Sequence, residues 1–288
     1  MTDGMLAYRV VDVFADAAFA GNPLAVVLDG DDLTTSQMQA IAKEFNLSET
    51  TFPVTPSSSA ATYRLRIFTP GTELPFAGHP SVGSAWVMRS LGRVGDGRAV
   101  QECGAGLLPI DIDGDRATLT GGSPTLGESI EPERAAAAVG LSASDVVGDP
   151  AQWAGMGLEF GFLHVKPEAL VRASLNPVLA ADLPPGAGLS VFAFANGVAR
   201  ARVFAPGAGV AEDPATGSAA LGLGVWLAAH GYVATEGETP YVVIQGVEMG
   251  RASRLECVVR CEAGAAVEGR VSGTVVPVAE GWMRRPEV

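Results

Sequence analysis

The chain has 288 residues, of which 48% are hydrophobic and 18% charged, a composition typical of a globular protein with room for two domains. Its 32 acidic and 19 basic residues give a net charge of −13, which disfavours binding to nucleic acid and to anionic membrane surfaces. No apolar run approaches the roughly 20 residues of a membrane span, and the first residues lack the pattern of an export signal. We therefore expect a cytoplasmic protein with no membrane or nucleic-acid partner.

In chain order, several short apolar runs that are bounded by glycine and proline come first, and they predict strands. The first clear helix signal follows them. The segment TTSQMQAIAKEF predicts an amphipathic helix with Thr34 or Thr35 as N-cap and Asn46 in a left-handed turn at its end. The apolar stripe of this helix consists of Met38, Ile41, Ala42 and Phe45. A second surface helix is expected to begin at Pro132.

Two stretches, residues 63–92 and 199–231, repeat one pattern. Each has a strand with an Arg-Xaa-Phe sequence, a Pro-Gly turn, a loop and a long apolar segment, and the loop is longer in the second copy. Insertions belong in loops, so the difference in length fits an internal duplication. The alternative is a pair of unrelated buried helices that each follow a common glycine-rich turn.

The apolar segment of each copy is long enough for a helix but has no polar face. A short helix that is apolar all round must be buried all round, so we expect an α+β fold with two pseudo-symmetric domains, each a curved sheet or barrel around a central helix. Gly83, Gly222 and Gly224 are expected to let strands approach these helices closely. The Gly-, Pro- and Glu-rich stretch from Ser123 to Glu131 suggests the boundary, giving domains 1–124 with 273–288, and 125–272.

The start of each buried helix is a candidate anion site. Gly78 and His79 begin one helix, and Gly217 and Ser218 begin the other. The free N–H groups and the positive dipole end of a helix are suited to hold a substrate carboxylate. Alternatively, His79 and Ser218 only cap their helices.

The three histidines and three cysteines predict no metal site and no disulfide framework. His79, His164 and His230 have no metal-ligand spacing, and the cysteines lack a CxxC pair. At a helix start His79 should be biased toward the neutral form, while His230 is expected to cap a helix C-terminus. Two cysteines, Cys257 and Cys261, would share the buried face of a strand as reduced core residues.

Glu49 is the candidate proton carrier, because it lies between a helix and a strand that alternates toward the core. If it is partly desolvated there, its pKa would rise toward the range useful for acid/base chemistry. The other interpretation is a solvated turn residue. Asp213 either caps its loop or orients a proton carrier, and the sequence does not exclude Glu73 or Glu212.

Several segments together resemble the PhzF-like family, which is related in fold to diaminopimelate epimerase. They are FAGNPLAVV, NLSETTF, RIFTPGTELPFAGHPSVG, EDPATGSAA and IQGVEMGR, and their order covers nearly the whole chain. The resemblance implies two pseudo-symmetric domains, each with a central helix. It also implies a cofactor-free enzyme without metal, acting on a small-molecule carboxylate, and a homodimer.

The resemblance assigns roles residue by residue. The glutamate of the Ser-Glu-Thr motif, Glu49, is implied to be the catalytic acid/base, and His79, Asp213 and Ser218 complete the catalytic set. The substrate-binding residues that we infer from the same motifs and the two helix starts are Asn22, Ser48, Gly78 and Gly217.

The resemblance also separates mechanisms. Cofactor-independent epimerases of this fold use a cysteine at each helix start, whereas this chain has His79 and Ser218 there. We therefore expect an isomerase in which one carboxylate moves a proton between carbons of a small, cyclic or unsaturated acid. Two alternatives remain: an epimerase or racemase of amino or hydroxy acids, and a non-catalytic small-molecule or protein-binding module.

Overall fold

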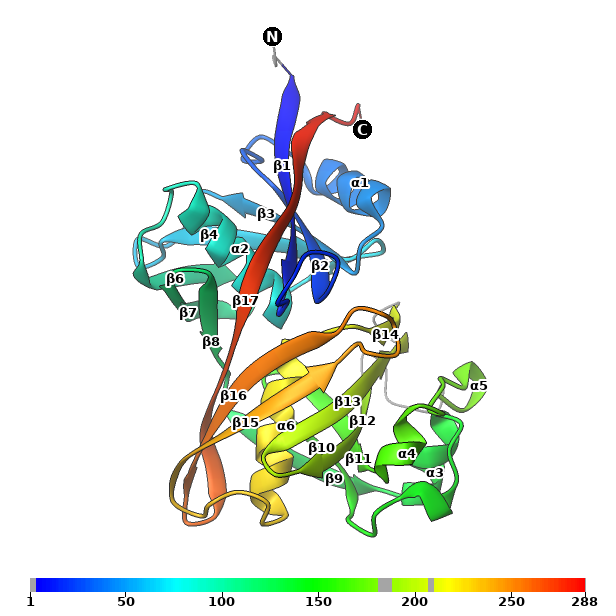
Figure 1. Cartoon of the computed structure of the whole chain (residues 1–288). Helices are drawn as coiled ribbons and strands as arrows, with labels where there is room; N and C mark the ends of the chain where they lie inside the picture. The colour runs from blue at the N-terminus through cyan, green and yellow to red at the C-terminus, as the bar shows by residue number, and fades with distance from the viewer. Residues whose placement is uncertain (1–3, 181–187, 207–209, 288) are drawn as a thin grey trace. The chain divides into compact units, whose positions relative to one another are not determined.

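The computed structural model describes residues 4–180, 188–206 and 210–287 (Figure 1). The chain divides into two compact units, one formed by Met1–Leu119 with Ser272–Val288 and the other by Thr120–Val271. The segment in which the sequence suggests the domain boundary is largely strand β9 (Pro124–Ile130), which pairs with β10 (Ala151–Met156). The boundaries after residues 124 and 272 remain a prediction.

The first unit is a barrel of strands around one helix. Its elements are β1 (Met5–Val13), β2 (Asn22–Val27), α1 (Thr35–Phe45), β3 (Glu49–Val54), β4 (Tyr63–Phe68), β5 (Glu73–Leu74), α2 (Gly78–Ser90), β6 (Gly97–Cys103), β7 (Gly106–Asp113) and β8 (Arg116–Thr120). The pairs β1–β2, β3–β4, β6–β7 and β7–β8 are antiparallel, whereas β2–β3 and β4–β6 are parallel. Strand β17 (Ala265–Arg284) pairs with both β1 and β8 and closes the barrel.

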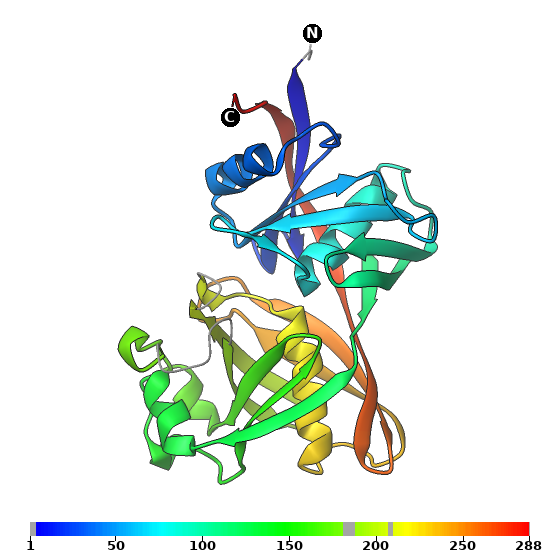
Figure 2. The same ribbon diagram turned by 180° about the vertical axis from the view of Figure 1, so that it is seen from behind.

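The second unit repeats this order of pairings. Its further elements are α3 (Pro132–Ala138), β11 (Glu159–His164), α4 (Pro167–Leu170), α5 (Pro177–Ala180), β12 (Gly188–Ala195), β13 (Val198–Ala205), β14 (Val210–Asp213), α6 (Gly217–Ala229), β15 (Gly237–Gln245) and β16 (Ser253–Glu262). The pairs β10–β11, β12–β13 and β15–β16 are antiparallel, whereas β11–β12 and β13–β15 are parallel. Figure 2 shows α6 running through the strands of its unit. The predicted fold class is confirmed.

Matching side-chain contacts support the duplication. In the first unit Arg66 pairs with Glu73 at 2.7 Å and lies 5.1 Å from the centre of the Phe68 ring. The second unit repeats both contacts: Arg202 pairs with Glu212 at 2.6 Å and lies 5.3 Å from the Phe204 ring centre. Gly207, the glycine of the second Pro-Gly turn, lies outside the described residues.

The two central helices are buried along almost their whole length, as their lack of a polar face predicts. A Cβ atom added to Gly83 would lie 2.7 Å from methyl groups of Val13 and Leu24, and one added to Gly222 would lie 3.1 Å from the carbonyl oxygen of Ala154. Gly224 makes a similarly close approach, to a tyrosine side chain. These glycines therefore let helix and strands come into direct contact.

The outer helix α1 has the predicted ends. Thr34 is its N-cap in a capping box with Gln37, and Asn46 ends it with a φ of 51°. Met38, Ile41 and Ala42 are buried against the barrel, and Phe45 is partly buried. The second outer helix, α3, begins at Pro132 as expected and buries three of its alanines. In the described part of the chain, no helix is both long and apolar enough to cross a membrane.

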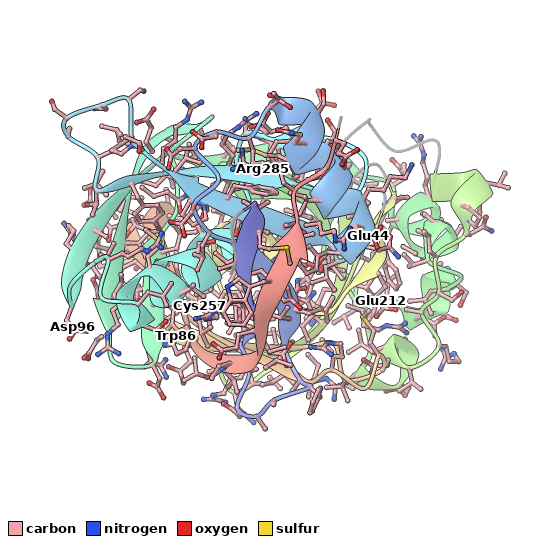
Figure 3. The ribbon with its side chains drawn as sticks, turned by 90° about the horizontal axis from the view of Figure 1, so that it is seen from above. Glu44, Trp86, Asp96, Glu212, Cys257 and Arg285 are labelled. Carbon is pink, nitrogen blue, oxygen red and sulfur yellow. The ribbon has the colours of Figure 1, made fainter. Side chains whose placement is uncertain are left out.

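The C-terminal end of α2 is solvent-exposed. Arg89 there pairs with Asp96 at 2.8 Å, and Asp96 lies at the outer edge of the view in Figure 3. The start of the helix, in contrast, is buried from Gly78 onward. We therefore expect chemically active groups at the buried start of α2 and not at its exposed end.

We predict that Gly83→Val destabilises the protein by about 1–3 kcal/mol, because the added methyl groups have no room beside Val13 and Leu24. Gly95→Val is the matched control, since a Cβ at Gly95 would meet nothing within 4 Å and should change stability by less than about 0.5 kcal/mol. Urea unfolding of both variants measures the difference. Equal effects would show that the close approach is not what stabilises this contact.

Candidate functional site

Four predicted site residues lie together in the first unit. Asn22 is the first residue of β2 and Glu49 the first of β3, and these parallel strands are neighbours. Ser48 directly precedes β3, and His79 is the second residue of α2. The ends of two strands and the start of the central helix thus bring these side chains into one cluster.

The cluster is a chain of polar contacts. Ser48 Oγ donates to Asn22 Oδ1 at 3.1 Å, and Asn22 Nδ2 lies 3.2 Å from His79 Nδ1. On the far side of the ring, His79 Nε2 lies 3.4 Å from Glu49 Oε2. Because Asn22 accepts from Ser48 through its oxygen, its NH₂ group donates to Nδ1 of His79. The imidazole proton then resides on Nε2, facing the carboxylate of Glu49.

His79 is neutral in this setting. Its side chain is 4% exposed, and burial lowers its pKa from 6.5 to about 3 because a charged ring would lose its hydration. Although Glu49 is only 3.4 Å away, the contact does not offset this loss, and Nε2 makes no hydrogen bond with any described residue. The pair is therefore a carboxyl group beside a neutral N–H donor, and not a salt bridge.

Glu49 is not a solvated turn residue. Its side chain is 13% exposed, so the carboxyl group is largely removed from water. The expectation that it lies at the junction before a strand is met, since it opens β3. A carboxyl group so placed is suited to accept and return a proton.

The start of α2 lacks a capping side chain. Ala77 is the N-cap residue, and within residues 4–180, 188–206 and 210–287 no acceptor is found for the N–H groups of Gly78 and His79. The His79 ring bonds Asn22 instead of capping the helix. These N–H groups remain open to an anion.

The second unit has a comparable helix start. Thr216 is the N-cap residue of α6 but makes no side-chain cap bond; its hydroxyl donates to Asp213 Oδ2 at 2.5 Å. Gly217 and Ser218, both buried, open the helix, and their N–H groups have no acceptor among the described residues. Asp213 therefore organises the turn before α6. The predicted convergence of the two helix starts on one substrate remains a prediction.

The two other acidic candidates have structural partners. Glu73 pairs with Arg66 and Glu212 with Arg202, in each case through both carboxylate oxygens. Each carboxylate is therefore engaged by a guanidinium fork through two parallel hydrogen bonds. Both residues therefore hold the β-hairpins that precede the central helices.

The remaining histidines and cysteines lie in structural positions. His164 Nδ1 lies 2.6 Å from Asp149 Oδ2, which also accepts from Tyr232 at 2.6 Å. His230 is the C-cap residue of α6, as predicted, with its Nδ1 2.8 Å from the carbonyl of Trp226. The three cysteines are free and buried, and Cys257 and Cys261 share strand β16 as expected. Among the described residues, no group of three or more His, Cys, Asp or Glu side chains could hold a metal ion.

One residue near the second helix start was not singled out from the sequence. Gln245, the last residue of β15, bonds the turn before α6. It lies in the IQGVEMGR segment that carries part of the family resemblance, and this segment is the only sequence signal that pointed to it.

Comparison with known proteins identifies the family. The model of phenazine biosynthesis-like proteins, PhzC-PhzF, matches residues 11–281. The trans-2,3-dihydro-3-hydroxyanthranilate isomerase of Pseudomonas aeruginosa is 38% identical, covering 95% of this chain and 98% of the relative. An uncharacterized isomerase of Mesorhizobium japonicum is 36% identical, covering 95% and 97%. The chain therefore belongs to the PhzF family, whose curated members include isomerases.

Solved structures agree with this assignment. A PhzF-family protein of Bacillus anthracis superposes with a TM-score of 0.88 at 28% identity, covering 97% of this chain and 99% of the other. A hydroxyproline epimerase of Agrobacterium vitis shares the fold alone, with a TM-score of 0.67 at 14% identity over 99% and 94% of the two chains. The predicted relation to the epimerase fold is thus confirmed.

We predict that His79 makes stability depend on pH. Its folded-state pKa of about 3 lies below its ordinary 6.5, so the unfolded chain binds the proton more readily, and stability is present above pH 6.5 and lost as pH falls toward 3. At about 1.4 kcal/mol per pH unit, lowering the pH from 6.5 to 5 should cost about 2 kcal/mol. The His79→Gln variant should not show this loss of stability between pH 6.5 and 5. Urea unfolding at both pH values measures it, and an identical pH slope in the variant would contradict a buried neutral His79.

Proposed function

We propose that this protein is an isomerase that moves a proton between carbon atoms of a small carboxylic acid, with Glu49 as both base and acid. The observation that carries the proposal is the carboxyl group of Glu49, 13% exposed and 3.4 Å from the Nε2 of a buried neutral histidine. A carboxyl group that is largely removed from water and lies beside a neutral ring can serve as both base and acid in turn.

The proposed reaction needs only one carboxyl group. Glu49 takes a proton from one carbon of the substrate, the electron pair of that C–H bond becomes a double bond to the neighbouring carbon, and the π electron pair of the original double bond moves to the carbon at the far end, where it forms the new C–H bond. The Glu49 carboxylic acid then returns the proton to the carbon at the far end. The proton is conserved, and no oxidant or reductant is consumed.

His79 assists by remaining uncharged. With the proton on Nε2, the imidazole donates toward Glu49 when the carboxyl group is ionised, and it is held in that orientation by Asn22 and Ser48. A charged imidazolium in the same place would hold Glu49 ionised and oppose the return of the proton. The polar chain behind the ring thus fixes the tautomer that the reaction uses.

The open N–H groups at the helix starts are suited to the substrate carboxylate. Gly78 in one unit and Gly217 and Ser218 in the other present such groups beside buried side chains. They would also stabilise negative charge that spreads from the deprotonated carbon into the carboxylate. Asp213 acts through Thr216, whose hydroxyl it binds at the start of α6.

The names of the relatives support a choice of substrate class. Trans-2,3-dihydro-3-hydroxyanthranilate, named for the Pseudomonas relatives, is an unsaturated cyclic carboxylic acid and is the first candidate to test. Catalysis without a cofactor, a homodimeric state and a cytoplasmic location remain part of this proposal. An epimerase is the alternative, since the predicted epimerase of Pseudomonas aeruginosa shares the fold at 32% identity with a TM-score of 0.80.

We predict that Glu49→Gln lowers kcat by at least about 10³-fold while leaving substrate binding within about tenfold, since the amide keeps the shape but cannot accept the proton. The measurement is the reaction of trans-2,3-dihydro-3-hydroxyanthranilate in deuterated water, followed by NMR. A shifted double bond supports isomerisation, whereas an unmoved double bond with deuterium at an inverted stereocentre supports the epimerase.

Glu73→Gln is the control, because that glutamate pairs with Arg66 at the surface and should leave kcat within about threefold of wild type. Full activity of Glu49→Gln would refute the role of Glu49. If the wild-type protein binds the acid but exchanges none of its protons, a non-catalytic binding module becomes the better interpretation.

A further inference from the structure

The side chain of Gln245 forms three hydrogen bonds to a single turn. Its Nε2 donates to the carbonyl oxygen of Asp213 at 2.7 Å and to Thr216 Oγ1 at 3.0 Å. Its Oε1 accepts from the backbone N–H of Thr216 at 3.2 Å. Gln245 is 1% exposed, so these bonds lie in a setting where water does not replace them readily. One side chain therefore fixes both ends of the turn that leads into α6. We call this set of three hydrogen bonds the clamp.

The backbone beyond Gln245 holds the same turn. Gly246 has a φ of +72°, and a Cβ atom there would lie 2.6 Å from the carbonyl oxygen of Pro214 and 2.4 Å from that of Arg251. The chain thus passes directly against the middle of the turn, where only glycine fits. Side chain and backbone together leave the turn little freedom to move.

The first unit has no such clamp at the matching place. Gly104 there packs on Pro75, with a Cβ position 2.7 Å from the Pro75 Cα, just as Gly246 packs on Pro214. Each proline precedes its helix start by the same number of residues, so Cys103, which precedes Gly104, corresponds to Gln245. A thiol is a weak donor and acceptor and cannot form these three bonds. The clamp thus belongs to the second unit.

A different glutamine serves the first unit in another way. Gln101 lies on β6, two residues before Cys103, and donates to Ser81 Oγ at 2.9 Å within α2. It also accepts from the hydroxyl of Tyr63 at 3.1 Å. Gln101 therefore links α2 to the strands of the barrel, and neither of these two hydrogen bonds reaches the turn before α2. The clamp on the turn is a specific feature of the α6 start.

We propose that Gln245 is a positioning residue that sets the direction of the Gly217 and Ser218 N–H groups for the substrate carboxylate. The inference rests on the proposed function. The direction of these groups depends on how Thr216 is held. Gln245 accepts from the backbone N–H of Thr216 and donates to its side-chain hydroxyl. A rigid set of donors stabilises an anion without having to reorganise when the anion arrives.

The enzymatic test uses Gln245→Met, which keeps the length of the side chain but loses all three bonds. Its KM for trans-2,3-dihydro-3-hydroxyanthranilate should rise at least about tenfold, with kcat changed less than about threefold, because carboxylate binding is lost more than proton transfer. Gln245→Glu should raise KM further, since it sets a negative charge and an acceptor oxygen against Asp213.

The control is Gln152→Met in the same unit. Gln152 is half-buried on β10 and donates to the carbonyl oxygen of Gly127 at 2.9 Å, so Gln152→Met removes a side-chain amide and its hydrogen bond without touching the turn. It should leave KM and kcat within about twofold. If it raises KM as Gln245→Met does, the effect is a general loosening of the unit and the proposal fails.

Amide hydrogen exchange needs no substrate, so it tests independently whether Gln245 orders the turn before α6. Hydrogen exchange of the Thr216 amide should be at least about tenfold faster in Gln245→Met, and the ¹⁵N–¹H resonances of Gly217 and Ser218 should shift. Unchanged exchange and resonances, or a wild-type KM, would overturn the positioning role. If the wild-type protein converts no acid at all, the proposed function is wrong, while the exchange result still decides whether Gln245 orders this helix start.

Discussion

The site depends on one constraint: a helix that is apolar all round must be enclosed by strands. Enclosure removes water from the first turn of α2 and α6, where N–H groups have no partner within the helix. On a surface helix such as α1, a capping threonine accepts from one of these groups, the N–H of Gln37. The central helices have no such cap, so an anion can occupy the place that a side chain takes elsewhere. The hydrophobic pattern of the two repeats therefore leads to uncapped N–H groups at both buried helix starts.

The same enclosure sets the charge state of the site. His79 is neutral because it is buried at a helix start, and it stays neutral although a carboxyl group lies 3.4 Å away. On a surface the same pair would attract a proton and become a weak salt bridge. Here Glu49 meets an N–H donor with no net charge, which can stabilise its ionised form without holding it in that form. Burial thus makes this pair a neutral donor beside a carboxyl group and not an ion pair.

The sequence was sufficient for features that depend on local pattern. The capped helix α1, the left-handed Asn46, the two unbroken apolar helices and the glycines beside them all follow from residue spacing. It could not decide between a solvated and a buried Glu49, because that depends on strands far away in the chain. The stretch in which the sequence suggests the domain boundary contains strand β9, whose side chains are exposed or half-buried throughout and therefore give only weak periodicity. Gln245 was missed because a single buried amide has no pattern.

The duplication explains why two similar helix starts differ in their supporting residues. Both units keep the arginine–glutamate pair on the hairpin and the glycine that packs on proline, since these contacts shape the barrel. They differ at the start of the helix itself, where one copy has a histidine backed by Asn22 and the other has a serine beside a turn held by Gln245. In the proposed function, a turn that positions backbone donors must be rigid, whereas a histidine that stays neutral beside Glu49 needs a fixed tautomer. Each copy is stabilised at the atoms that its own task requires.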